Sequence, residues 1–467
     1  MTDNDKHASL SLAQPNPAGL NSGQKLGLAL GLLGVGIMAL ALLGAGINAG
    51  VFLWVALFSM LSGGVVYGVA AYNNKPQGIK NNGIWFDGLS ARGAVGWSLG
   101  VLLTGFYIVL YWFPSVLGLG QDGASSTGLI AFFDPLSYAI KGQAASQWFV
   151  YGTLYTVAIL SLGVKFMLKY RHIRYQLIRT VIVMISQFFL AYFIPEILEG
   201  LNSQAAYFDK DLKNMWPLNY DFFDNWHLNN MTSSGTYGMF FLVFGIFMFV
   251  VFTPIITYFV GKRWYCSWVC GCGGLAETAG DDFRHLSSKK LSSWKLERWL
   301  IHSVMVLVFV MTAASLYGYF KGTDSIFGLS IYEYFKKPYG FLIGAMFSGV
   351  IGVGFYPLLG NRVWCRFGCP LAGYMGIIQR FKSRFRITTN GGQCISCGNC
   401  STYCEQGIDV RWYAQRGQNI VRASCVGCGI CSAVCPRGVL KLENGPEQGR
   451  INDDPIIIGN DGVRLRS

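Results

Sequence analysis

The cysteines of the C-terminal region are the residues whose types and spacing point most directly to chemistry. The chain has 13 cysteines, and the first of them is Cys266. Two segments share the spacing C-x₂-C-x₂-C-x₃-C, and a proline follows the second. The first run contains Cys394, Cys397, Cys400 and Cys404, and the second contains Cys425, Cys428, Cys431 and Cys435. This spacing is typical of chains that bind two [4Fe–4S] clusters.

The fourth cysteine of each run is expected to bind the other run's cluster, because three thiolates on one tight loop enclose only part of a cubane. Cluster A is predicted on Cys394, Cys397, Cys400 and Cys435, and cluster B on Cys425, Cys428, Cys431 and Cys404. Zinc is the alternative, but zinc ligands commonly come as separated pairs. Glu405 stands where proline is usual, and we expect it to raise the exposure of cluster B or to shift its potential.

A second group of cysteines lies in two similar segments, 261–271 and 360–370. Both read G-x-R-x-aromatic-C-x-aromatic-x-C, which indicates an internal repeat. The C-x₃-C spacing predicts both thiols of a copy on one helical face. If the copies pack together, they form a third site from Cys266, Cys270, Cys365 and Cys369. Four such thiolates suit an iron–sulfur cluster or copper(I), although buried cysteines also serve as small hydrophobic residues.

Three further residues accompany this repeat. Cys272 is an additional thiol that either substitutes as a ligand or is inert. Arg263 and Arg362 occupy equivalent positions in the two copies. Arginine there can neutralise thiolates or anchor a helix end at the lipid headgroups, and we favour the headgroup role.

The elements that position these cysteines are predicted to be membrane spans. The chain has 467 residues, of which 52% are hydrophobic and 13% charged. Soluble domains carry about 25% charged residues, so the deficit indicates a lipid environment. Apolar stretches of the length that a span needs are expected at about 26–46, 50–72, 95–118, 147–169, 177–198, 237–260, 299–320 and 339–359.

The loop charges predict the orientation. Basic residues crowd the segments 165–179, 262–298 and 362–386, whereas 209–224 is acidic. By the positive-inside rule, eight spans then place both termini and all cysteines on the cytoplasmic side of a bacterial inner membrane. Cytoplasm also keeps the thiols reduced. The net charge of +13 is explained by these loops, so we predict lipid contact and no nucleic-acid partner.

The predicted fold class is an all-α polytopic membrane domain of about eight spans, followed by an α+β bacterial 2[4Fe–4S] ferredoxin-like domain. The predicted divisions are a disordered cytoplasmic tail (1–24), an N-terminal membrane domain of about five spans (25–198), a periplasmic loop (199–236), a membrane domain with the duplicated segments (237–388), the ferredoxin domain (389–442) and a C-terminal tail (443–467).

Motifs for other cofactors are not found in the sequence. It has no C-x-x-C-H segment, no phosphate loop, and no G-x-G-x-x-G after a predicted strand. We therefore predict no haem, flavin or nicotinamide. Electrons are expected to enter through a quinol or a protein partner.

Spans, two C-x₃-C segments and a doubled ferredoxin motif together resemble the NapH/NosR/CcoG-type membrane polyferredoxins, over roughly residues 237–442. Segment 404–411 is similar to CcoG-type proteins, whereas the paired C-x₃-C segments are closer to NapH and NosR. Gly271 replaces the proline that the family has in the first copy. The resemblance implies electron transfer linked to the quinone pool, which feeds or maintains a periplasmic or membrane reductase.

Three functions compete on this basis. The leading one is a redox subunit or accessory of a respiratory reductase system, relaying electrons between quinone or a membrane partner and the cytoplasmic clusters. The alternative is a CcoG-like copper reductase or metalloenzyme assembly factor. A transporter gated by the clusters ranks last, because the spans contain few ionisable residues.

Overall fold

The computed structural model describes residues 19–46, 49–73, 90–120, 124–201 and 222–444, together with two short strands near the C-terminus. Most of the predicted N-terminal tail, the middle of the predicted 199–236 loop and most of the predicted C-terminal tail lie outside these residues. The first helix begins at Ser22, earlier than its hydropathy indicates. The Asn21 side chain accepts from the Gln24 backbone N–H at 2.8 Å, and the Gln24 side chain accepts from the Asn21 N–H at 3.0 Å. This capping box extends the helix into polar sequence.

Seven helices in the described part of the chain are long and apolar enough to cross a membrane. They are α1 (Ser22–Leu42), α2 (Ala49–Tyr72), α3 (Ala94–Trp112), α6 (Gln147–Lys169), the run of α7 (Arg174–Ile185), η3 (Ser186–Phe193) and α8 (Ile194–Leu201), the run of α10 (Gly235–Phe247), η4 (Met248–Phe252) and α11 (Thr253–Val260), and α14 (Leu291–Lys321). Seven of the eight predicted spans are thereby confirmed as helices, and the chain is a multi-pass membrane protein.

The eighth predicted span, 339–359, is not one continuous helix. Its helical part starts earlier, as η6 (Tyr332–Lys336), α15 (Lys337–Tyr339) and the π-helical η7 (Gly340–Ile351), and a turn separates it from α16 (Tyr356–Leu359). Glycines explain the departure, because they let the chain approach α3 closely. A Cβ at Gly349 would lie 2.7 Å from the Tyr111 ring, and one at Gly354 would lie 2.6 Å from the Thr104 hydroxyl. Close packing of this kind is a general use of glycine in membrane helices.

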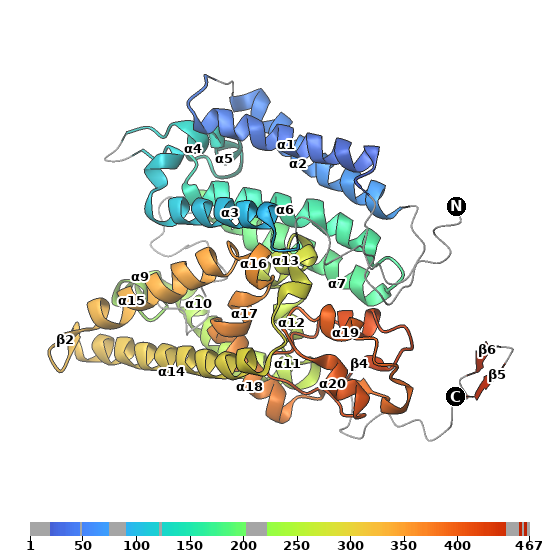
Figure 1. Cartoon of the computed structure of the whole chain (residues 1–467). Helices are drawn as coiled ribbons and strands as arrows, with labels where there is room; N and C mark the ends of the chain where they lie inside the picture. The colour runs from blue at the N-terminus through green and yellow to red at the C-terminus, as the bar shows by residue number, and fades with distance from the viewer. Residues whose placement is uncertain are drawn as a thin grey trace.

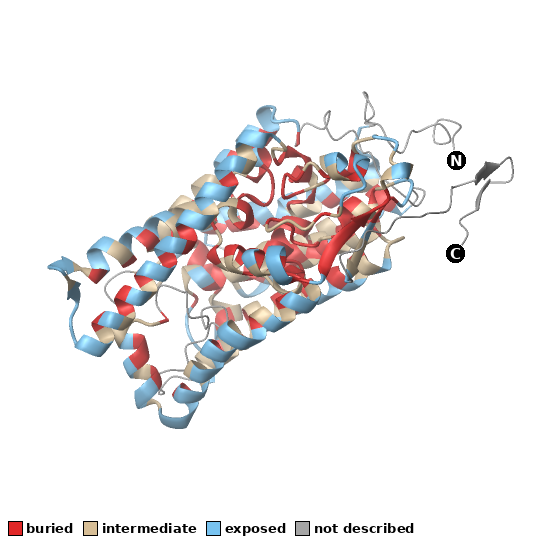
Figure 2. Ribbon diagram, turned by 90° about the horizontal axis from the view of Figure 1, so that it is seen from below, coloured by how far each residue is buried: buried red, intermediate tan, exposed pale blue. Residues whose placement is uncertain are grey.

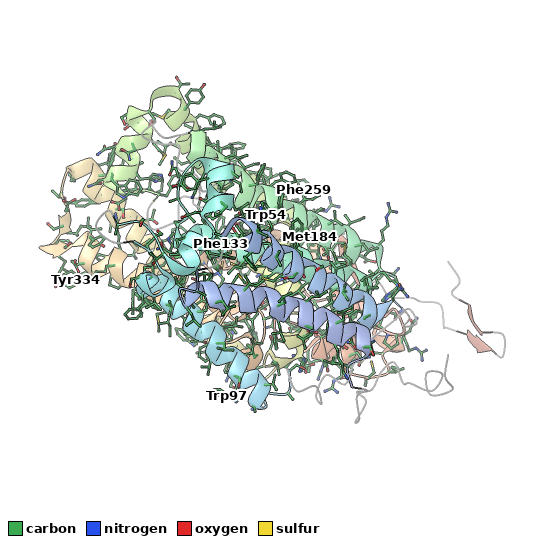
Figure 3. The ribbon with its side chains drawn as sticks, turned by 90° about the horizontal axis from the view of Figure 1, so that it is seen from above. Trp54, Trp97, Phe133, Met184, Phe259 and Tyr334 are labelled. Carbon is green, nitrogen blue, oxygen red and sulfur yellow. The ribbon has the colours of Figure 1, made fainter. Side chains whose placement is uncertain are left out.

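The long helices expose apolar side chains along their outer faces. Figure 2 shows exposed residues along the helices and buried residues where strands and loops meet them. Trp54 on α2, Trp97 on α3 and Phe259 on α11, labelled in Figure 3, are 45%, 56% and 48% exposed. Such a surface suits lipid, because apolar side chains at this density are unfavourable in water.

The N-terminal helices pack around one core. α1 and α2 lie side by side along their length, and α2 packs on α6 (Figure 1). Three short helices close one end of this core: η2 (Pro114–Leu117), which falls within the predicted span 95–118, and α4 (Gly128–Phe132) and α5 (Asp134–Lys141), which hydropathy did not predict. The core includes Leu53, Leu110, Phe133 and Phe149, all fully buried.

Short helices follow the sixth and eighth helical segments and build the two copies of the repeat. The first copy has α12 (Arg263–Cys266), α13 (Gly271–Thr278) and η5 (Asp281–Leu286), and the second has α16, α17 (Val363–Phe367) and α18 (Pro370–Lys382). Gly261 and Gly360 precede α12 and α17 with φ of 71° and 96°. Because L side chains rarely adopt this conformation, both copies need glycine where the chain leaves the membrane helix.

The C-terminal domain lies at one end of the helical bundle (Figure 1). It contains β3 (Phe385–Thr389), η8 (Gly391–Gln393), α19 (Asn399–Thr402), α20 (Val410–Gln415), α21 (Ile430–Ala433) and β4 (Leu440–Asn444). β3 and β4 are antiparallel, with Phe385 opposite Asn444 and Thr389 opposite Leu440. The ferredoxin-like architecture of short helices and one small sheet is confirmed.

The remaining elements lie elsewhere on the chain. They are α9 (Asn225–Ser233), the antiparallel pair β1 (Ser325–Ile326) and β2 (Leu329–Ser330), and the antiparallel pair β5 (Ile457–Gly459) and β6 (Gly462–Arg464). In Figure 1, β2 and the C-terminal domain mark opposite ends of the bundle. The long helices therefore separate the β1–β2 turn from the cysteine sites.

Candidate iron–sulfur sites

The four cysteines predicted for cluster A surround one cavity. Its lining includes Cys394, Cys397, Cys400 and Cys435. Burial, together with the neighbouring thiols of Cys435, Cys397 and Cys394, raises the pKa of Cys400 to about 12. Cys435 comes from the second run, as the exchange of fourth cysteines requires. The structure brings the four together, and their role as ligands stays a prediction.

The four cysteines predicted for cluster B also gather in one place. Burial raises the pKa of Cys431 well above its ordinary value, and the thiols of Cys428, Cys425 and Cys404 raise it further. Cys404, which comes from the first run, accepts from the Ile408 backbone N–H at 3.4 Å. Hydrogen bonds of this kind orient a ligand sulfur and tune the potential of an iron–sulfur site.

The two loops adopt the same turn. Gly398 and Gly429 precede α19 and α21 with φ of 81° and 73°. Ser396 and Gly427, which directly precede the second cysteine of each run, also have positive φ, of 60° and 65°. Left-handed residues fold the chain sharply enough for successive cysteines to face one centre.

Within the residues that the structure describes, no three side chains of His, Cys, Asp or Glu are arranged to hold a single metal ion. A cubane keeps its thiolates farther apart than one ion does. Copper at the C-x₃-C segments therefore gains no support from the geometry of the described residues.

The C-x₃-C cysteines do not lie on one helical face, so that prediction is wrong. Cys266 ends α12 and Cys270 precedes α13, whereas Cys365 lies within α17 and Cys369 precedes α18. Each pair therefore straddles a break between two short helices. The Cys369 sulfur accepts from the Ala372 backbone N–H at 3.4 Å, so it caps α18.

The two copies nevertheless bring their cysteines together. Burial raises the pKa of Cys369 well above its ordinary value, and the thiols of Cys365, Cys266 and Cys270 raise it further. Cys266 and Cys369 also belong to one apolar cluster with Met375 of α18. All four predicted residues of the third site thus lie near one another, and their ligand role stays a prediction.

Cys272 lies beside this group. A hydrogen bond from the Cys272 thiol lowers the pKa of Cys270 to about 6, although burial opposes the shift. Cys270 is thereby favoured as thiolate and Cys272 as thiol. The neighbouring Gly271 lies against η3, because a Cβ there would come 2.8 Å from the Gln187 amide oxygen. This contact favours glycine at residue 271.

Arg263 and Arg362 do not anchor helix ends at lipid headgroups, so the favoured prediction is wrong. Arg362 is 1% exposed, and its guanidinium lies 3.3 Å from the Cys266 carbonyl oxygen and 3.8 Å from the Cys365 sulfur. Arg263 is buried as well and covers the ring of Phe385 at 4.9 Å. Both arginines instead join the repeat to the ferredoxin-like domain or to its cysteines.

A buried network of charges, which no short-range pattern in the sequence predicts, lies between the two cysteine regions. Arg362 binds Glu277 at 2.6 Å and Glu405 at 3.0 Å, and Arg284 binds Glu405 at 2.9 Å. Arg179 of α7 also binds Glu277. Glu405 itself is fully buried, so the expectation that it raises exposure at cluster B is wrong. Buried charges need partners of this kind, and the partners here come from distant segments.

The third site and the cluster B loop are in direct contact. The Ser267 hydroxyl donates to the Val426 carbonyl at 2.8 Å, which joins the residue after Cys266 to the residue after Cys425. Gln379 of α18 donates to the Cys425 carbonyl at 2.7 Å. Cys428 packs on the apolar cluster that holds Cys266 and Cys369. The two sites therefore share one packed boundary.

Comparison with known families agrees with these sites. A family described as a 4Fe-4S binding domain matches residues 241–292 and 341–388, which contain both C-x₃-C segments. A second family, described as a 4Fe-4S dicluster domain, matches residues 386–447. No solved structure matches the chain significantly.

Three curated relatives are similar over about a third of the chain. YccM of Escherichia coli, named as an electron transport protein, is 25% identical over 35% of this chain and 47% of its own length. The methylamine utilization ferredoxin-type protein MauN of Methylobacillus flagellatus is 26% identical over 31% of this chain and 49% of its own length. The regulatory protein NosR of Stutzerimonas stutzeri is 28% identical over 34% of this chain and 22% of its own length. The chain thus spans about half or less of each relative.

The fold and the gathered cysteines define an iron–sulfur electron-transport protein of the membrane, with 4Fe–4S binding domains. The family matches and the three relatives support the NapH/NosR type of membrane polyferredoxin, which the motifs of this chain resemble.

Proposed function

We propose that this protein relays electrons between the membrane and its C-terminal clusters, as a subunit or accessory of a respiratory reductase system. Clusters A and B would be held by the two sets of four cysteines described above. The membrane end of the relay would be the C-x₃-C site, in exchange with a quinone or a protein partner in the bilayer. The relatives named as electron transport and ferredoxin-type proteins support this proposal.

The observation that carries the proposal is the shared boundary between the C-x₃-C site and the cluster B loop. Ser267 and Val426 are hydrogen bonded at 2.8 Å, and each directly follows a predicted ligand. Electron transfer between redox centres needs them to be close and rigidly placed. This boundary supplies a short, packed path from the end of the membrane helices to cluster B.

The third site is best interpreted as another [4Fe–4S] cluster. The 4Fe-4S binding family match covers both C-x₃-C segments. The four thiols lie near one another beneath the membrane helices, and Arg362 supplies a buried positive charge beside Cys365. A cation next to a thiolate-bound cluster stabilises its extra electron.

The orientation belongs to the proposal as well. Both termini and all the cysteine sites are placed on the cytoplasmic side, where thiols stay reduced. The C-terminal domain and the described N-terminal end lie at the same end of the bundle (Figure 1), which supports this arrangement.

The test is anaerobic purification of the full chain followed by metal analysis and electron paramagnetic resonance. Wild type is expected to hold about twelve iron atoms, and a Cys266→Ala/Cys365→Ala variant about eight, with one signal lost. The matched control is Cys272→Ala, which should keep every signal. Protein that contains zinc and little iron would overturn the proposal, and equal iron in wild type and double variant would remove the third cluster from it.

The copper-reductase alternative is less well supported. A thiol that reduces or delivers copper must meet the ion in solution, whereas Cys266 and Cys365 are only 5% and 8% exposed. The dithionite-reduced protein should therefore reduce Cu(II) at the same rate with and without the Cys266→Ala change.

A further inference from the structure

The two ferredoxin loops are equivalent in sequence but differ in what covers them. Ile395 and Val426 each follow the first cysteine of a run, yet Ile395 is 53% exposed and Val426 is 1% exposed. A Cβ at Gly398 would meet only the Arg411 guanidinium, at 3.9 Å, whereas a Cβ at the equivalent Gly429 would meet the Tyr175 ring at 3.0 Å. The cluster A loop is thus open and the cluster B loop is covered.

The membrane domain supplies the cover of the cluster B loop. Tyr175 of α7 donates to the Gly427 carbonyl at 2.9 Å, and Gln176 donates to the Cys428 carbonyl at 2.8 Å. Phe166 and Tyr170, from the end of α6, pack against Cys428 as well. Cluster B therefore faces the membrane domain, and a partner from solution meets cluster A first.

The open cluster A face is basic and partly apolar. Arg411 and Arg437 line the cavity that the four cysteines surround. Trp412 is 44% exposed, and the Arg416 guanidinium lies 4.0 Å from the centre of its ring. Lys441, which directly follows the lining residue Leu440, is exposed as well. Within 390–444 the acidic residues are Glu405, Asp409 and Glu443, and none of them is exposed.

We propose that this face is the docking surface for an acidic, soluble one-electron carrier protein, and that electrons pass between that carrier and the C-x₃-C site through cluster A and then cluster B. Charge complementarity identifies the partner as acidic, because basic rims steer acidic proteins and set their association rate. The half-exposed Trp412 and Ile395 supply apolar contact of the kind that interfaces favour. This inference rests on the proposed relay and adds the partner protein and the order in which electrons pass through the clusters.

The electron balance is simple. A reduced carrier gives one electron to oxidised cluster A, so the carrier is oxidised by one electron and the cluster is reduced by one. No covalent bond forms or breaks. In the opposite direction the same face would deliver the electron to an oxidised carrier.

The experiment uses the full chain in phosphatidylcholine nanodiscs, with reduced flavodoxin as the acidic probe. Stopped-flow absorbance follows cluster reduction at low ionic strength. An Arg411→Glu/Arg437→Glu variant is expected to slow the second-order rate at least tenfold and to flatten its salt dependence. Arg411→Lys/Arg437→Lys, which keeps the charge, should retain most of the rate.

The matched control is Lys295→Glu/Lys321→Glu, which makes the same change of net charge on α14, away from the cavity. It should leave the rate within about twofold. Iron content and reduction by dithionite are measured first on every variant. Full clusters with equal flavodoxin rates in wild type and charge-reversed protein would overturn the docking surface and leave the proposed relay intact, whereas clusters missing from wild type would overturn the relay itself.

Anionic lipid is the other ligand that a basic face could take. If the face rested on headgroups, phosphatidylglycerol in the nanodiscs would slow flavodoxin in wild type and not in the charge-reversed variant. That result would overturn the proposal. An equal, small effect of phosphatidylglycerol on both proteins supports it.

Discussion

The guanidinium of Arg362 and the carboxylate of Glu405 form an ion pair at 3.0 Å in which both side chains are fully buried. Arg362 precedes the C-x₃-C cysteines of the second copy, and Glu405 follows Cys404 of the predicted cluster B. The pair therefore fixes the ferredoxin-like domain on the membrane domain at the point where the two cysteine sites meet.

Glu405→Gln should weaken this junction. Arg362 and Arg284 would each lose one of the two carboxylates that compensate their buried charges, and breaking a buried pair costs about 3–5 kcal/mol. Loss of a negative charge beside Cys404 should also make the potential of cluster B less negative, because the reduced cluster carries the extra electron. Thermal unfolding and a redox titration followed by electron paramagnetic resonance measure the two effects.

The control for Glu405→Gln is Glu443→Gln on β4, which removes a half-buried carboxylate that accepts from the Thr388 hydroxyl at 2.7 Å. The unfolding temperature of this control should fall much less, and the reduction potential of its cluster B should not change. Equal effects of the two variants would contradict the role given to Glu405.

The variants Cys270→Ala and Cys272→Ala should show which of the two neighbouring cysteines is a ligand of the third site. The hydrogen bond from Cys272 lowers the pKa of Cys270 to about 6, so Cys270 is the thiolate of the pair. We expect Cys270→Ala to lose the signal of the third site and Cys272→Ala to keep its iron. Metal analysis with electron paramagnetic resonance gives the answer. If Cys272→Ala also loses that signal, the two ligand roles must be exchanged or shared.

Acid should destabilise the protein partly through His285 of η5. Burial, with the charges of nearby Lys289 and Lys169, lowers the pKa of His285 from 6.5 to about 4, against the opposing effects of the Ser90 carbonyl and Asp282. As the pH falls, the unfolded state binds a proton at His285 before the folded state does. The stability of the fold with neutral His285 is therefore complete above pH 6.5 and is lost as the pH falls toward 4. The full loss amounts to about 3 kcal/mol.

His285→Gln keeps a donor for the Ser90 carbonyl and removes the titration. The difference in unfolding temperature between wild type and variant should shrink or reverse as the pH drops from 7 to 4.5. A difference that does not change with pH would contradict the assignment.

Two glycines of α1 that lie one helical turn apart, Gly27 and Gly31, should differ in how well they tolerate alanine. A Cβ at Gly27 would lie 2.5 Å from the Tyr67 backbone nitrogen and 2.7 Å from the Gly63 carbonyl oxygen, whereas a Cβ at Gly31 meets nothing within 4 Å. Gly27→Ala should therefore cost about 1–3 kcal/mol through overpacking between α1 and α2. Gly31→Ala should be neutral or stabilising by up to about 1 kcal/mol. Thermal unfolding in one detergent compares them, and the reverse order would show that the helix pair is arranged differently.

Local patterns in the sequence were sufficient for the spans and for the cysteine groups. Apolar length predicts a membrane helix because unsatisfied backbone is so costly in lipid, and this worked for seven of the predicted spans. Cysteine spacing predicts a cluster loop because the cluster dictates where its thiolates must be. These rules act within a few residues, so no knowledge of the rest of the fold was needed.

Only the tertiary structure decided how these pieces meet. The partners of Arg362 are Glu277 and Glu405, 85 and 43 residues away in sequence, and no short-range pattern links them. The same limit applies to the C-x₃-C cysteines, whose helices break between the thiols, and to the 339–359 segment, whose glycines fit against α3. Burial of a charge or a close approach of backbone depends on which distant segment packs there, and packing over such distances is decided by the whole chain.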